Sequence, residues 1–138
     1  MIDRQMLLIP NSIRVLRGSM VRFKVLRIFT GSDGESHFED VEIPLSHASA
    51  AGLLSDLGKA SGIVFRETGL DYDYDWHRAP RRQYVINLSG GVEIENGGGN
   101  KRRLGPGEVL LAEDTTGRGH RSRAIGNEPR RSILVTLD

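Results

Sequence analysis

The sequence has no cysteine among its 138 residues. This absence excludes a disulfide scaffold, a zinc site built on thiolates, an iron–sulfur cluster and a cysteine nucleophile. Long apolar runs are missing as well, since no stretch approaches the roughly 20 residues that a membrane-spanning helix needs. We therefore expect a soluble, cytoplasmic protein without a membrane partner.

Neither sign of charge dominates the chain, which has 19 Lys and Arg against 18 Asp and Glu and a net charge of +1. This balance argues against a nucleic-acid partner. The charge is unevenly spread, however, because residues 1–75 sum to −3 and residues 76–138 to +4. The difference indicates a cationic region on one part of the surface or in a pocket.

The first residues differ in pattern from the rest of the chain. Gly18-Ser19-Met20 resembles a cloning junction followed by an initiator methionine. We predict that residues 1–19 are an N-terminal extension, either a tag or a miscalled start, and that residues 20–138 form a single domain. The alternative is a native strand in which Ile13 and Val15 pack on a sheet edge.

Most of the chain alternates short β-branched and aromatic runs with glycine turns. Many short strands with this spacing predict an all-β sandwich or barrel. Residues 46–59 are the only helical candidate. Ser49 is placed to cap this helix, and Leu53, Leu54 and Leu57 give it a short apolar face.

Residues 71–77 alternate strictly, and alternate residues of a strand share a face. One face is aromatic and consists of Tyr72, Tyr74 and Trp76. The opposite face is polar and consists of Asp71, Asp73, Asp75 and His77. The aromatic face is either a stacking platform for a ring or sugar, or a core or dimer-interface surface, and we favour the second interpretation.

Two stretches resemble the histidine motifs of the cupins, which are small jelly-roll barrels of two sheets. In the first, His77 stands at the first histidine position when Gly90 is aligned with the motif glycine. In the second, residues 105–108 form the Pro-Gly turn, and Gly117 is followed three residues later by His120. The resemblance implies an all-β, double-stranded β-helix (a cupin jelly-roll barrel) with a short helical segment, and a homodimer.

The resemblance also implies a metal site, because cupins hold iron, manganese, nickel or zinc with three imidazoles and one carboxylate. Here Ala79 replaces one imidazole and Gln83 replaces the carboxylate. The implied divalent metal site is thus reduced to His77, Gln83 and His120, and the uncharged amide of Gln83 is a weak ligand. Either a carboxylate on the face of His77, such as Asp75, restores the site, or the protein has no cofactor.

The strand around Gln83 contains two arginines, Arg81 and Arg82, which point to opposite faces. A guanidinium inside the barrel would bind a carboxylate or phosphate in a bidentate manner. Strand parity places Arg81 on the face of Gln83. The alternative is that these arginines form ion pairs with nearby acidic residues, such as Glu113, and only connect strands.

The sequence therefore predicts a cupin-like domain that binds a small polar or anionic metabolite inside its barrel. Its binding residues are expected to be His77, Arg81, Gln83, His120 and Asp75. The sequence does not decide whether the protein is an enzyme. The alternative is a non-catalytic sensor or structural module with a degenerate site, which the missing imidazole and carboxylate favour.

Overall fold

The computed structural model describes residues 21–138, so the predicted extension at residues 1–19 lies outside the described part of the chain. Residues 21–138 contain twelve strands and no helix. None of these residues belongs to a helix that is long and apolar enough to cross a membrane. The strands are β1 (Arg22–Thr30), β2 (Ser36–Pro44), β3 (His47–Ser49), β4 (Gly52–Leu54), β5 (Gly62–Thr68), β6 (Asp73–His77), β7 (Gln83–Ser89), β8 (Gly91–Glu95), β9 (Lys101–Leu104), β10 (Val109–Glu113), β11 (His120–Ile125) and β12 (Arg130–Thr136).

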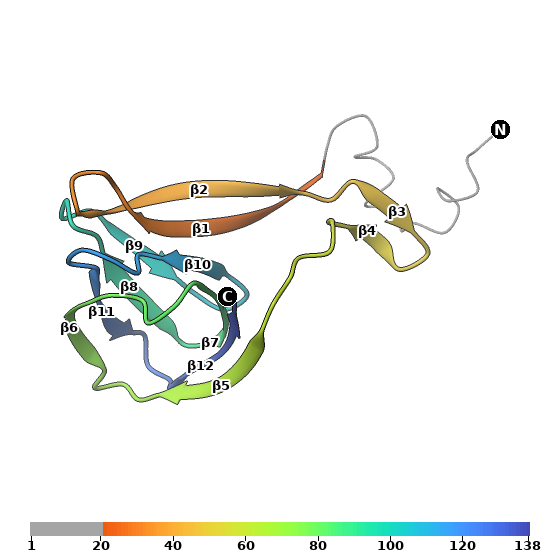
Figure 1. The fold of residues 1–138 in the computed structure, drawn as a ribbon. Coiled ribbons are helices and arrows are strands. Elements are labelled where there is room, and N and C mark those ends of the chain that lie inside the picture. Colours follow the sequence, from red (N-terminus) through yellow and green to blue (C-terminus); the bar gives the residue numbers. More distant parts are fainter. Residues whose placement is uncertain (1–20) are drawn as a thin grey trace. The chain divides into compact units, whose positions relative to one another are not determined.

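The described residues fall into two compact units, one of residues 25–41 and 59–138 and the other of residues 21–24 and 42–58. The larger unit is built on two sheets (Figure 1). One sheet has the strand order β2-β1-β10-β7-β12-β5, and the other has the order β6-β11-β8-β9. The pairing of β1 with β10 is parallel, whereas β10, β7, β12 and β5 pair antiparallel to one another.

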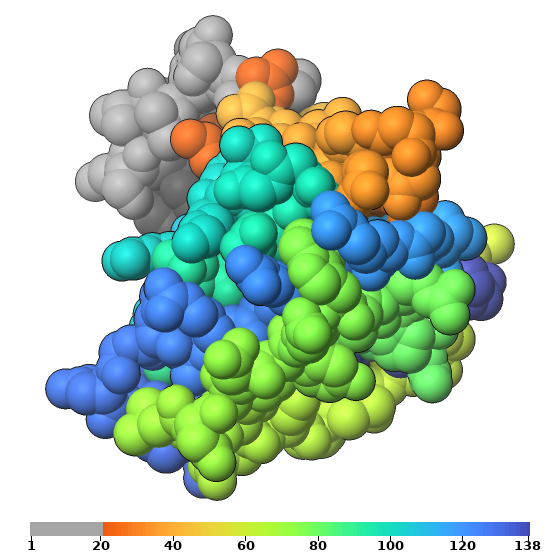
Figure 2. Space-filling model, turned by 90° about the vertical axis from the view of Figure 1, so that its left-hand side faces the viewer, coloured from red at the N-terminus to blue at the C-terminus, as the bar shows by residue number. Residues whose placement is uncertain are grey.

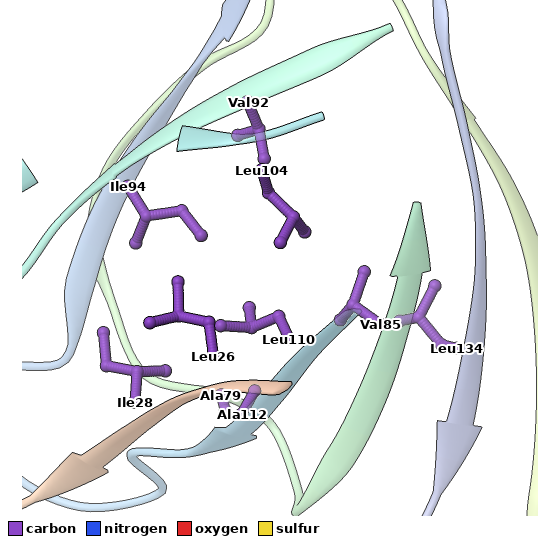
Figure 3. Close-up of a cluster of buried hydrophobic side chains, with 10 residues drawn as sticks. All are labelled: Leu26, Ile28, Ala79, Val85, Val92, Ile94, Leu104, Leu110, Ala112 and Leu134. Atoms are coloured by element: carbon purple, nitrogen blue, oxygen red, sulfur yellow. The ribbon is translucent and has the colours of Figure 1, made fainter. Parts of the chain in front are cut away.

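The core of the larger unit lies between these two sheets. Figure 3 shows Val92, Ile94 and Leu104 of the four-stranded sheet pointing towards Leu26 and Leu110 of the six-stranded sheet. Buried and partly exposed residues alternate along β7, β10 and β12, as expected for strands with one face towards a core. The predicted all-β fold of two sheets is therefore confirmed.

The predicted helix over residues 46–59 is wrong, because β3 and β4 form an antiparallel hairpin there. The turn that joins them requires Gly52, whose φ of 114° is unfavourable for other residues. Ser49 does cap a local structure, but its hydroxyl accepts a hydrogen bond from the backbone N–H of Ala51 and stabilises the turn instead. Leu57 is 98% exposed and packs on no apolar face.

Candidate functional site

A cavity of about 480 Å³ lies between the two sheets of the larger unit. Its apolar part is formed by core residues such as Val85, Val92 and Leu134. Its polar part includes both motif histidines, His77 and His120. A cavity of this size, with an apolar wall and a few convergent polar groups, is typical of small-molecule sites.

A bulge in β6 directs His77 into this cavity. His77 is opposite His120 and Tyr74 is opposite Ser122, so two residues of β6 face the single Arg121 of β11 between these pairs. An extra residue reverses the alternation of a strand, and His77 therefore shares the side of Tyr74, with 3.8 Å between their ring centroids. Figure 2 shows this region from outside, with β6 in green beside the blue of β11.

The strict alternation expected for residues 71–77 is therefore broken, and the aromatic stripe does not form one surface. Tyr72 and Tyr74 line the cavity, but Trp76 does not. The Trp76 ring instead lies 4.0 Å from the guanidinium carbon of Arg118 and 5.5 Å from that of Arg121. The homodimer expected from this stripe stays a prediction.

The two imidazoles are close to one another and both are oriented through Nδ1. Their ring centroids are 4.5 Å apart. His77 Nδ1 donates a hydrogen bond of 2.7 Å to the backbone carbonyl of Asp75, and His120 Nδ1 donates one of 2.5 Å to Asp114 Oδ2. A carbonyl or carboxylate oxygen can only accept such a bond, so the lone pair of each neutral ring is on Nε2.

The Asp114 carboxylate that orients His120 is completely buried. Its Oδ2 binds His120, while its Oδ1 has no hydrogen-bond partner among residues 21–138. The backbone carbonyl of Asp114 accepts a bond of 3.1 Å from the N–H of Ala79, which fixes the loop after β10 against the segment after β6. A buried carboxylate with a single partner interacts strongly with that partner, here the imidazole of His120.

Burial lowers the pKa of His77 below 6.5, and the positive charge of a protonated His120 lowers it further. We expect an NMR titration to show that His77 is mostly neutral at pH 6.5, because its pKa lies below this value. Because the unfolded chain takes up this proton near pH 6.5 and the folded chain only at lower pH, the free energy of unfolding should fall as the pH drops below 6.5. The fall should stop at the pKa of His77 itself, and a pKa of 6.5 or higher would contradict the expectation.

The structure separates the other predicted site residues. Gln83 is buried and lines the cavity beside the histidines. Arg81 is exposed and is not among the lining residues, and Asp75 is exposed on the opposite side of β6. Arg82 forms an ion pair of 2.6 Å with Glu113, which is the alternative that the sequence left open for these arginines.

The residues in the cavity do not fit the metal site that the resemblance to cupins implies. Within residues 21–138, no group of three or more His, Asp or Glu side chains could hold a metal ion. Ala79 offers no ligand, and Asp75 faces away. The Asp114 carboxylate already accepts a hydrogen bond from His120 Nδ1. Two imidazoles and the amide of Gln83 remain, without the negative charge that a divalent cation favours.

Three polar side chains of the site were not predicted from the sequence. They are Asp114, which follows β10, and the two arginines Arg66 and Arg130. Both arginines line the cavity. The positive charge of residues 76–138 was a signal for a cationic pocket, but it did not indicate which arginine enters it.

No family model and no curated protein matches the chain. Among solved structures, the cupin domain of Cnp3 from Schizosaccharomyces pombe is 12% identical, covers 86% of this chain and 84% of its own, and has a TM-score of 0.45. A conserved protein of unknown function from Streptococcus pyogenes is 19% identical, covers 62% of this chain and 71% of its own, and has a TM-score of 0.43. Likenesses at this level carry no argument about function. The likeness to the cupin domain is modest and is consistent with a cupin-like fold.

Proposed function

We propose that the chain binds a small polar molecule in the cavity and that His120 exchanges a proton with it. The observation that carries this proposal is the buried bond of 2.5 Å between His120 Nδ1 and Asp114 Oδ2. It fixes the tautomer in which Nε2 accepts a proton, and the carboxylate stabilises the imidazolium that forms. His120 Nε2 has no hydrogen-bond partner among residues 21–138, so a bound molecule would supply one.

Other polar groups of the cavity support the binding of a polar molecule. Gln83 is 7% exposed, and its side-chain amide makes no hydrogen bond to another residue within 21–138. The Gln83 side chain lines the cavity, so a ligand oxygen or hydroxyl there would have this amide as a hydrogen-bond partner. The reaction class that these groups favour is isomerisation or elimination. In isomerisation a proton leaves one ligand carbon for His120 Nε2 and returns to a neighbouring atom of the ligand. In elimination the same proton is given to a hydroxyl group on the neighbouring carbon, whose C–O bond breaks so that it leaves as water. Such chemistry needs no oxidant or reductant.

The second candidate is a non-catalytic sensor that binds its ligand without changing it. Ala79 and Gln83 favour this candidate, because they stand where the cupin motif has an imidazole and a carboxylate. Both candidates require the cavity to bind a small molecule, and they differ only in proton exchange.

Binding is best tested through the histidine side chains, since the chain has only four. We expect a small oxo acid, hydroxy acid or sugar that occupies the cavity to shift the NMR signals of His77 and His120. His37 is partly exposed and binds Asp33, and His47 is exposed and binds Asp56. Neither lines the cavity, so their signals should stay in place and serve as internal controls. If no compound moves the His77 and His120 signals, or if all four histidines shift together, the proposal is wrong.

Proton exchange is then measured on the compounds that bind. After incubation in D₂O, mass spectrometry should find deuterium on a carbon next to the ligand's carbonyl group. His120→Asn should abolish this incorporation, because its amide cannot take up a proton at neutral pH. Binding without any incorporation by the wild type would favour the sensor.

A further inference from the structure

We infer that Arg66 and Arg130 form an oxyanion subsite at one end of the cavity, which takes the carboxylate or phosphate group of the bound molecule. The inference rests on the proposed function, because it names the chemistry of a ligand in the same cavity. Its evidence is separate from the histidines and comes from the pairing of β5 with β12.

The register of these strands brings the two arginines together. Arg66 of β5 is opposite Ser132, and Arg130 of β12 is opposite Thr68, so the arginines are diagonal neighbours on one face of the sheet. That face lines the cavity. Because both guanidinium groups are positively charged and are diagonal neighbours, they repel each other. An anion bound between them would offset this repulsion.

Each guanidinium is held by a neutral acceptor on one edge only. Arg66 Nε donates a bond of 3.1 Å to Ser132 Oγ, and Arg130 Nε donates one of 3.0 Å to Asn87 Oδ1. Asn87 is completely buried and is itself fixed by a bond of 2.9 Å from its Nδ2 to the carbonyl of Gly90. The Nη groups, which carry most of the donors of an arginine, have no partner within residues 21–138. The side chains are therefore oriented before a ligand arrives.

No carboxylate compensates either charge in the part of the chain that the structure describes. Arg131, the next residue after Arg130, points to the other face and forms an ion pair of 3.0 Å with Glu67. Arg130 is 6% exposed and forms no such pair. Burial and the nearby charge of Arg66 lower the pKa of Arg130 to about 10. Burying a charge without a counterion costs free energy. Residues 21–138 supply no counterion for Arg130, so we expect a bound anion to supply it.

The subsite and the imidazoles are connected by two tyrosines. Tyr72 lines the same cavity as Arg66 and Arg130. The ring centroids of Tyr72 and Tyr74 are 6.2 Å apart, and Tyr74 stacks on His77. A small molecule whose oxyanion is bound by the arginines would thus extend along the tyrosines towards the imidazoles. Guanidinium groups favour carboxylate and phosphate because they bind two oxygens at once.

The test compares charged compounds with neutral analogues. Lactate is compared with lactamide, which has nearly the same shape, and glycerol 3-phosphate is compared with glycerol, which lacks the phosphate. Affinity is read from the His77 and His120 NMR signals. For the wild type we expect the charged member of at least one pair to bind about 10- to 100-fold more tightly. The pair that shows this preference identifies the group as a carboxylate or a phosphate.

Arg130→Gln and, separately, Arg66→Gln should remove the preference, while Arg131→Gln should keep it. Arg131 is the matched control because it is adjacent in sequence but lies outside the cavity. If charged and neutral members bind the wild type equally, the oxyanion subsite is overturned and the proposed function stands. If no compound of either pair moves the imidazole signals, both are overturned. The wild-type comparison needs no variant, so it remains decisive even if an arginine variant does not fold.

Discussion

Gly119→Ala is expected to destabilise the protein by about 3 kcal/mol or more. Gly119 has a φ of 78°, which is costly for alanine. A Cβ at this position would also overlap the carbonyl group of His77 and lie 2.7 Å from the backbone nitrogen of Arg78. Backbone atoms cannot move aside as a flexible side chain can, so β6 and β11 would have to separate where they carry the two imidazoles.

Gly126→Ala is the matched control for this experiment. Gly126 has a φ of 89°, and a Cβ there would meet no atom within 4 Å. This variant should therefore lose only about 1–2 kcal/mol, from the left-handed backbone conformation alone. Chemical denaturation of both variants measures the difference. Equal losses would show that the close approach of Gly119 to His77 does not matter for stability.

Asp114→Asn is expected to slow proton exchange strongly while leaving the imidazole of His120 in place. The carboxamide keeps the size of the carboxylate but removes the charge that stabilises an imidazolium on His120. Its NH₂ group can also donate to Nδ1, which moves the ring proton to Nε2, the nitrogen that must be free. We expect deuterium incorporation into the ligand to fall about 10³- to 10⁴-fold.

Nitrogen chemical shifts report the tautomer of His120 directly. The wild type should show a protonated Nδ1, and Asp114→Asn should show a substantial population protonated at Nε2. Asp73→Asn is a suitable control, because Asp73 is exposed on the side of β6 away from the cavity. The role given to Asp114 is wrong if its variant keeps the wild-type tautomer and rate, or if Asp73→Asn alters them equally.

The sequence was sufficient to predict the fold class, because β-branched runs and glycine turns are local signals that the two sheets obey. The same local signals failed at residues 46–59, where they predicted a helix and the structure has the hairpin of β3 and β4. The leucine spacing around Leu53 and Leu57 is equally compatible with a helix, and the deciding feature is the φ of Gly52. A backbone angle of this kind is not visible in a hydrophobic pattern.

The site was only partly predictable. The motif spacing indicated that His77 and His120 would meet, and the structure places them together. The arginines could not be found from the hydrophobic pattern, because β5 inverts it. Phe65 is 73% exposed on the outer face, while Arg66 lies on the face that lines the cavity. The usual rule that apolar residues face the core would have placed Phe65 inside and Arg66 outside.

The bulge in β6 and the buried Asp114 were beyond prediction for another reason. The bulge depends on the register between β6 and β11, two strands separated by more than forty positions along the chain. Asp114 follows β10, and its role depends on contacts with His120 and Ala79, which come from other elements. Strict alternation predicted that His77 shares a face with the aspartates of β6. The extra residue in the pairing moves His77 to the opposite face, which lines the cavity. The register is set by the pairing of two strands, so it cannot be predicted from the sequence of one strand alone.

The parallel pairing of β1 with β10 determines the order in which the chain can fold. It joins Leu26 to Leu110, so the segment 25–41 is synthesised long before its neighbour in the sheet exists. Closing so large a loop is slow, whereas the antiparallel neighbours β8 and β9 can associate locally. We therefore expect β1 to dock late in folding, with Leu26 and Ile28 exposed to chaperones or to other nascent chains until then.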